Sequence, residues 1–232
     1  MHTFGAPADM AATLRAVLFD LDGTLLDTAP DMAGALNVLR QEHLMSPLPF
    51  DAVRSAVSHG AARVVKEGFP DADAAAFPAL QTRFLEIYRA RLSRETRLFA
   101  GMDQVLHTLE NWRVKSGIVT NKAAWLTDPL LADLGLSTRF ACVVSGDTVA
   151  ERKPHPLPLL HAAALVGARP DECIYVGDAQ RDVQAARAAA MPALVASYGY
   201  LRADEDPALW GGDGYLKKPL DLLDWLEASG RL

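Results

Sequence analysis

Short apolar runs that end in small or acidic residues recur along this 232-residue chain and constrain its fold more than any other feature. The runs are Ala16–Asp20, Gly117–Thr120, Cys142–Ser145, Cys173–Gly177 and Ala193–Ala196. All but the first are uncharged, which is typical of strands that are buried on both faces of a sheet. Helical patterns separate them, at Met102–Trp112, Ala123–Leu134, Pro156–Val166 and Asp182–Ala190. This alternation predicts an α/β fold with a parallel sheet.

One long segment lacks the alternation. Between Pro30 and Leu98 there is no convincing strand, and the helix-like stretches are Asp31–His43, Phe50–Val57, Ala61–Glu67 and Asp73–Leu92. We therefore expect residues 30–98 to form a small all-helical domain inserted after the first strand, and residues 1–29 and 99–232 to form the α/β core. Loops at the carboxyl ends of strands are where α/β proteins bind ligands, so the insertion is expected to cover the site as a lid. Its hinges are expected near residues 28–30 and 98–101.

Composition excludes several classes of protein. The chain carries 23 Lys and Arg against 29 Asp and Glu, a formal net charge of −6, which argues against nucleic acid and anionic membranes as partners. No apolar stretch approaches the roughly 18 residues that cross a bilayer, and residues 1–12 lack the pattern of a signal peptide. Cys142 and Cys173 lie in apolar runs and are expected to be buried, reduced thiols. A cytoplasmic protein is expected.

Two acidic residues, Asp20 and Asp22, stand where the first predicted strand ends. Gly23 can turn the chain there so that both carboxylates face one crevice. An Asp-x-Asp-Gly sequence also occurs in calcium-binding loops, but such loops continue with further oxygen ligands and a distal Glu. The residues that follow, Thr24-Leu25-Leu26, do not fit a calcium loop.

The segment 20–27, DLDGTLLD, resembles the first motif of the haloacid dehalogenase-like hydrolases, specifically of their phosphatases. Three further segments resemble the later motifs of that family in the same order: GIVTNK with Thr120 and Asn121, ERKPHP with Lys153, and VGDAQRD with Asp178 and Asp182. A lone DxDG is a weak signal, whereas four motifs in order are a strong one. The resemblance covers residues 15 to about 226, and it implies a three-layer Rossmann-like core with a helical cap.

The resemblance also implies roles for these residues. Asp20 would be the nucleophile that forms an aspartyl-phosphate, and Asp22 the general acid and then the general base. Thr120, Asn121 and Lys153 would bind the phosphoryl oxygens, because a phosphate monoester resists attack until positive charge offsets its own.

Mg²⁺ is the implied cofactor, since this hard ion prefers oxygen ligands. Its expected ligands are Asp20, the backbone carbonyl of Asp22, and Asp178, with Asp182 acting directly or through a water. The cation offsets the charge of these acids, so the crevice can accept a phosphate although the chain as a whole is acidic.

Four alternatives share part of this chemistry. A response-regulator receiver carries its acceptor Asp after a later strand and has no use for the insertion. A true dehalogenase needs no metal, and Asp22 argues against it. Phosphonate cleavage needs a Schiff-base lysine in the insertion, where Lys66 is the only lysine. A sugar-phosphate mutase shares all four motifs and stays open.

The substrate implied by the resemblance is a small phosphorylated metabolite. Several segments, among them KPHPLPLL and residues 198–200 (YGY), resemble phosphoglycolate phosphatases, whereas the tail 198–215 and the segment 58–64 resemble N-acetylmuramic acid 6-phosphate phosphatases about as well. Phosphoglycolate is the first candidate and the sugar phosphate the second. His59, Gly60 and Arg63 are expected to recognise the leaving group, so that Arg63→Ala raises KM without abolishing the chemistry. The sequence leaves a monomer and a dimer open.

Overall fold

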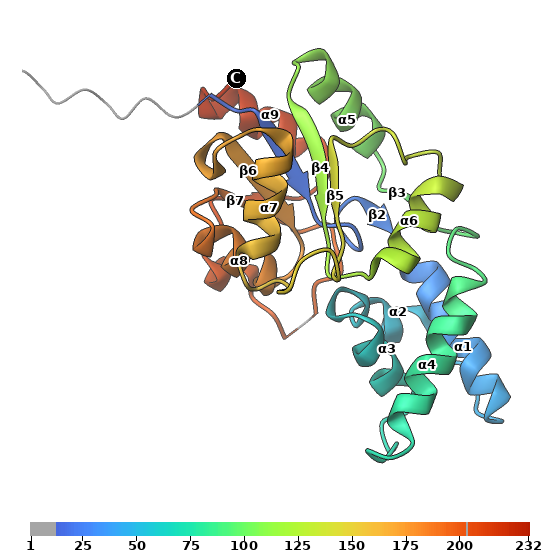
Figure 1. Cartoon of the computed structure of the whole chain (residues 1–232). Helices are drawn as coiled ribbons and strands as arrows, with labels where there is room; N and C mark the ends of the chain where they lie inside the picture. Colours follow the sequence, from blue (N-terminus) through green and yellow to red (C-terminus); the bar gives the residue numbers. More distant parts are fainter. Residues whose placement is uncertain (1–12, 203) are drawn as a thin grey trace, which may run out of the picture.

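The computed structural model describes residues 13–202 and 204–232, so the expectation that residues 1–12 carry no signal peptide lies outside the described residues. Six parallel strands form its central sheet, in the order β5-β4-β1-β6-β7-β8 (Figure 1). Their bounds are β1 (Ala16–Phe19), β4 (Lys115–Val119), β5 (Cys142–Val144), β6 (Cys173–Gly177), β7 (Ala193–Ala196) and β8 (Gly214–Leu216). The predicted parallel α/β sheet is confirmed. The edge strand β8 was not predicted.

Strand β1 lies in the middle of the sheet and is buried on both faces. Val17 and Phe19 belong to one hydrophobic core and Ala16 and Leu18 to the other, as the two-residue period of a strand requires. The first core includes side chains of α5 (Met102–Asn111), α6 (Ala124–Asp133) and α9 (Asp221–Ser229). The second includes side chains of α7 (Leu157–Val166) and α8 (Gln180–Ala188). The result is a sheet between two helical layers.

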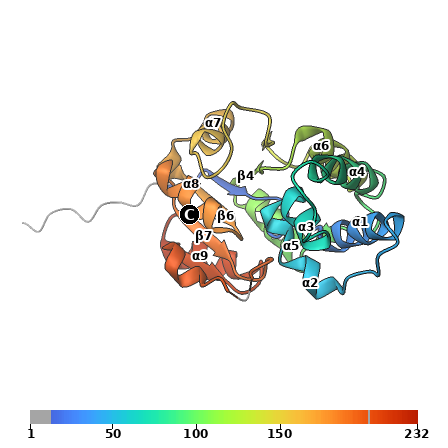
Figure 2. The ribbon, with the colours of Figure 1, turned by 90° about the horizontal axis from the view of Figure 1, so that it is seen from below.

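A bundle of helices, here called the helical insertion, lies at one end of the sheet (Figures 1 and 2). Its elements are α1 (Ala29–Glu42), α2 (Phe50–Arg54), the 3-10 helix η1 (Val57–His59), α3 (Ala61–Gly68) and α4 (Phe77–Arg89). The chain enters and leaves it through a two-stranded antiparallel ribbon of β2 (Leu26–Asp27) and β3 (Arg97–Leu98). Strands of two residues carry no readable pattern, so the sequence did not predict the ribbon. The remaining 3-10 helices are η2 (Pro170–Glu172) and η3 (Pro207–Trp210).

Two expectations from composition can be compared with this structure. Cys142 and Cys173 are buried free thiols, as predicted. Within the described part of the chain, every helix is too short or too polar to span a bilayer.

Asp31, in the first turn of α1, ties the start of the insertion to the segment that leaves it. Its carboxylate is fully buried, and Oδ2 accepts hydrogen bonds from the backbone N–H groups of Glu95 and Thr96 and from the Thr96 hydroxyl, each at 2.9 Å. These contacts join residues that are more than sixty positions apart. Asp31 therefore closes the base of the insertion beside the ribbon.

Replacing Asp31 by Ala is expected to destabilise the protein by about 3 kcal/mol, because a buried donor left unpaired costs about 1–3 kcal/mol. Urea unfolding followed by circular dichroism measures this loss. Asp71→Ala, at an exposed position of the same insertion, is the matched control and should change the free energy of unfolding by less than about 0.5 kcal/mol. Equal stabilities of the two variants would contradict the proposed role of Asp31.

Candidate active site

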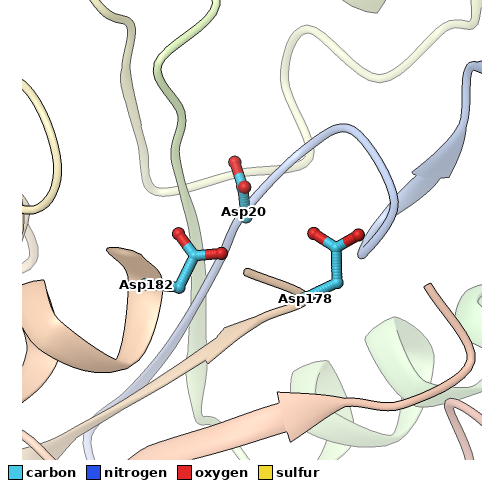
Figure 3. A group of neighbouring side chains, drawn as sticks. All are labelled: Asp20, Asp178 and Asp182. Atoms are coloured by element: carbon cyan, nitrogen blue, oxygen red, sulfur yellow. The ribbon is translucent and has the colours of Figure 1, made fainter. Parts of the chain in front are cut away.

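Three carboxylates meet at the carboxyl edge of the sheet: Asp20, Asp178 and Asp182 (Figure 3). Asp20 directly follows β1, Asp178 directly follows the neighbouring β6, and Asp182 lies in the first turn of α8. One oxygen from each lies within 4.8 Å of the others. Asp178 and Asp182 are only 2% and 1% exposed. Parallel strands end at a common edge, which is why the separate motifs converge here.

The cluster carries more negative charge than its protein surroundings balance. Burial raises the pKa of Asp20 to about 6, with Lys153 opposing the rise. Burial, together with the charges of Asp20 and Asp182, raises the pKa of Asp178 to about 7. Three carboxylates with oxygen atoms at coordinating separation and one adjacent ammonium group form a donor set that fits a hard divalent cation.

Lys153 is the ammonium group beside the cluster, and it is 3% exposed. Its Nζ lies 2.9 Å from Asp20 Oδ1 and 2.8 Å from Asp182 Oδ1, and it donates to the Tyr175 hydroxyl at 2.7 Å. Although burial lowers the pKa of Lys153, the charges of Asp182 and Asp20 raise it more, so the net shift is upward. The lysine is therefore a fixed positive charge next to Asp20.

Thr120 and Asn121 follow β4 and, like Asp20, line a cavity between the core and the helical insertion. The Asn121 side chain donates to the backbone carbonyl of Lys153 at 2.9 Å and accepts from its N–H at 3.0 Å. This amide group therefore holds the loop that carries Lys153. Among the described contacts, the backbone N–H of Asn121 has no partner, so it is the group of this residue that can bind a phosphate oxygen.

The carboxylate of Asp22 does not belong to the acidic cluster. It accepts a hydrogen bond from the Thr28 hydroxyl at 2.7 Å, and Lys122 Nζ lies 2.9 Å from its Oδ1. Lys122 also donates to the Tyr88 hydroxyl at 2.9 Å. Burial lowers the pKa of Lys122, but the charge of Asp22, the Tyr88 hydroxyl and the hydrogen bonds to both groups together raise it more, so the ammonium form is held. Sequence reasoning gave Lys122 no role, although it follows Thr120 and Asn121 in the second motif.

The insertion contributes one face of the site through the segment at η1. Ser58 donates a hydrogen bond to Asp178, and His59 Nε2 lies 3.3 Å from Glu205 Oε1 of the core. Burial, and then the nearby charge of Arg181, lowers the pKa of His59. Gly60 has φ +84°, a region that favours glycine, although a Cβ there would meet no atom within 4 Å.

Arg63 is placed differently from the other predicted recognition residues. His59 and Gly60 line the cavity, whereas Arg63 is not among its lining residues. Its guanidinium lies 3.4 Å from Glu67 one turn along α3. Arg63 therefore lies outside the cavity lining in this structure, and its contact with the leaving group stays a prediction.

A cavity of about 410 Å³ lies over the nucleophile candidate Asp20, between the core and the insertion. Its basic lining residues are His59, Lys122, Arg152, Lys153 and Arg181. Its larger apolar and aromatic lining residues are Met32, Leu85, Tyr88, Trp125 and Leu126. The cavity thus combines an acidic floor with positively charged and apolar walls.

Arg181 is the second residue that sequence reasoning missed. It lies in the first turn of α8, next to Asp182, and it is half-buried. Its guanidinium makes no hydrogen bond or ion pair with the part of the chain that the structure describes. Its place inside the fourth motif was a usable signal, but the sequence does not show that the side chain reaches the cavity.

Comparison with known proteins now identifies the family. Residues 17–196 match the model described as haloacid dehalogenase-like hydrolase. The chain belongs to this family. It is 45% identical over 205 residues to a phosphoglycolate phosphatase of Xylella fastidiosa, covering 88% of this chain and 90% of the relative. It is 36% identical over 217 residues to an N-acetylmuramic acid 6-phosphate phosphatase of Pseudomonas putida, covering 93% and 97%.

The fold of this chain is also found in a solved structure. The fold matches that of a predicted phosphoglycolate phosphatase from Haemophilus somnus with a TM-score of 0.82 at 24% identity, over 92% of this chain and 98% of the other. At that identity the likeness shows the fold alone. The curated relatives indicate that this haloacid dehalogenase-like hydrolase is a phosphatase, which removes the receiver-domain alternative.

The raised pKa values predict how a divalent cation acts on stability. Without the metal, Asp20 and Asp178 hold protons in the folded state that the unfolded chain releases from about pH 4, so their contribution to stability falls as the pH rises through about 6 to 7. Metal binding displaces those protons and is therefore favoured at higher pH. We expect Mg²⁺ to raise Tm at least about twice as much at pH ~8 as at pH ~5.

Thermal unfolding in EDTA and in saturating Mg²⁺ at both pH values measures this difference. Asp178→Asn should remove most of the Mg²⁺ effect, whereas Asp71→Asn, on the surface of the insertion, should leave it intact. A Tm increase that is the same at both pH values would count against the acidic cluster as the metal site.

Proposed function

We propose that the chain is a Mg²⁺-dependent phosphatase that hydrolyses a small phosphomonoester through an aspartyl-phosphate on Asp20. The observation that carries the proposal is the position of Asp20, which lies within coordinating separation of Asp178 and Asp182 and 2.9 Å from Lys153 Nζ, and which lines the cavity. A nucleophile for phosphate needs adjacent positive charge, and this position supplies it.

Asp20, Asp178 and Asp182 would hold the Mg²⁺, together with the backbone carbonyl of Asp22. When bound, the ion neutralises charge on the phosphoryl oxygens and on the carboxylates around them. Lys153 and the N–H groups near Thr120 would hold the remaining phosphoryl oxygens. Asp20 is then free to approach the phosphorus atom in line with the leaving oxygen.

The reaction has two steps in this proposal. In the first, an Asp20 oxygen forms a bond to phosphorus, the ester P–O bond breaks, and Asp22 gives its proton to the leaving alcohol. In the second, Asp22 takes a proton from water, the water oxygen bonds to phosphorus, and the bond from Asp20 breaks to release inorganic phosphate. Residues 30–98 act as a cap that excludes bulk water between the steps.

2-Phosphoglycolate is the leading substrate in this proposal. Its support is the 45% identity to relatives named phosphoglycolate phosphatase, together with the guanidinium of Arg181 on the cavity wall. This group has no ion-pair or hydrogen-bond partner among the described residues, and it suits a carboxylate on the leaving group. N-acetylmuramic acid 6-phosphate, which also carries a carboxylate, is the second candidate on 36% identity. Release of inorganic phosphate, rather than of an isomeric sugar phosphate, separates a phosphatase from a mutase. We place the protein in the cytoplasm, because reduced thiols such as Cys142 and Cys173 persist there.

Asp20→Asn is expected to lower the turnover of p-nitrophenyl phosphate by at least about a thousandfold, because the amide cannot form the phosphoryl bond. The variant should keep the parent's circular dichroism spectrum. EDTA should inhibit the parent protein, and added Mg²⁺ should restore its activity. Parent-like turnover by the Asp20→Asn variant, or activity that survives chelation, would contradict the mechanism.

Arg181→Met is expected to raise KM for 2-phosphoglycolate by about tenfold, as the loss of one charge-assisted contact predicts, and to leave KM for p-nitrophenyl phosphate within about twofold. Arg63→Met is the matched control, since its guanidinium pairs with Glu67 outside the cavity lining. Steady-state kinetics of phosphate release measures both. A larger KM effect from Arg63 than from Arg181 would reverse the assignment.

A further inference from the structure

We propose that Lys122 and Tyr88 are positioning residues for Asp22, so that proton transfer to the leaving group depends on a contact between the core and the helical insertion. The inference rests on the proposed function, in which Asp22 is the general acid. It adds two residues to that function and links the insertion directly to the chemistry.

Lys122 joins the two parts of the molecule. It follows β4 in the core, and its side chain is 6% exposed. Its Nζ lies 2.9 Å and 3.2 Å from the two carboxylate oxygens of Asp22, and 2.9 Å from the hydroxyl oxygen of Tyr88. The three N–H groups of an ammonium match these three acceptor atoms. Lys122 therefore fixes Asp22 and Tyr88 relative to each other.

Tyr88 belongs to α4 of the insertion and is 1% exposed. Besides accepting from Lys122, it places its ring 4.7 Å from the ammonium nitrogen, a separation that favours a cation–π contact. Its ring also stacks on Phe84 of the same helix, with the centroids 6.1 Å apart. The tyrosine is thus rigidly held by the insertion, and a shift of α4 would move the acceptor away from Lys122.

The same contacts fix the carboxylate that must transfer the proton. Thr28, beside the start of α1, donates to Asp22 Oδ1 at 2.7 Å, so Asp22 is held by groups on two sides. Asp22, Lys122 and Tyr88 all line the cavity above Asp20. A general acid must stay within hydrogen-bond reach of the leaving oxygen, and a side chain released from Lys122 can rotate to other rotamers. Losing Lys122 should therefore harm proton transfer more than phosphoryl transfer.

Two substrates separate these steps. An alkyl phosphomonoester such as 2-phosphoglycolate releases an alcohol that needs a proton, whereas p-nitrophenyl phosphate releases a phenolate that does not. Lys122→Met is expected to lower two rates unequally: kcat for the alkyl ester and the rate of first-turnover release of p-nitrophenolate. The loss in kcat should be at least about tenfold larger than the loss in p-nitrophenolate release, which is compatible with the ~100-fold to 10,000-fold contribution of general acid catalysis. Tyr88→Phe, which keeps the buried ring, should lower kcat for the alkyl ester by about threefold and leave KM within about twofold of the parent value. Lys66→Met, on the insertion surface, is the control and should leave both rates unchanged.

A double-mutant cycle with Asp22→Asn decides whether Lys122 acts through Asp22. When Asp22→Asn is already present, the substitution of Lys122 should change the residual rate by less than about twofold, because the group it positions is already lost. Equal losses on the two substrates, or a Lys122 effect on the residual rate of Asp22→Asn as large as its effect on the parent rate, would overturn the positioning role while leaving the proposed function intact. An Asp22→Asn variant that keeps the parent rate on the alkyl ester would instead overturn the acid role of Asp22 in the proposed function.

Discussion

The repulsion among three clustered carboxylates, two of them buried, is the constraint on which the rest of the site depends. Asp20, Asp178 and Asp182 are brought within 4.8 Å by strand ends that share one edge of the sheet, and Lys153 supplies one nearby positive charge. The remaining negative charge suits a divalent cation, and in the proposed function this cation would allow an acidic protein to bind a phosphate. The crowding also explains why residue 23 is a glycine, since a Cβ there would lie 2.1 Å from an oxygen of Asp178.

The helical insertion is attached to this centre by polar contacts rather than by apolar packing alone. Ser58 donates to Asp178, and Tyr88 accepts from Lys122, which also contacts Asp22, whereas Asp31 joins the two ends of the insertion to each other. Each contact joins a residue of the insertion to one that the sequence places far away. In the proposed function, such contacts would couple substrate binding to the position of the insertion over the cavity.

The sequence predicted the core of the site because Asp20, Thr120 and Asp178 each follow a buried strand, and parallel strands end together. It missed β8, whose glycine and exposed tyrosine give no apolar run. It also named Arg63 and not Arg181, although Arg181 is the one of the two that lines the cavity. The reason is physical: the rotation of a helix, which decides the direction of a side chain, depends on tertiary packing that a single motif does not encode. The sequence also does not show that Lys122 contacts Tyr88, since Tyr88 lies 34 residues earlier in the chain.

In the proposed mechanism the phosphoryl group passes through Asp20. Rapid acid quenching of the Mg²⁺-loaded protein during turnover, followed by peptide mass mapping, tests this step. We expect a phosphoryl adduct on the peptide that contains Asp20, and its release by hydroxylamine as for an acyl phosphate. An adduct on another residue, or steady turnover with no adduct under conditions that trap acyl phosphates, would rule out Asp20 as the nucleophile.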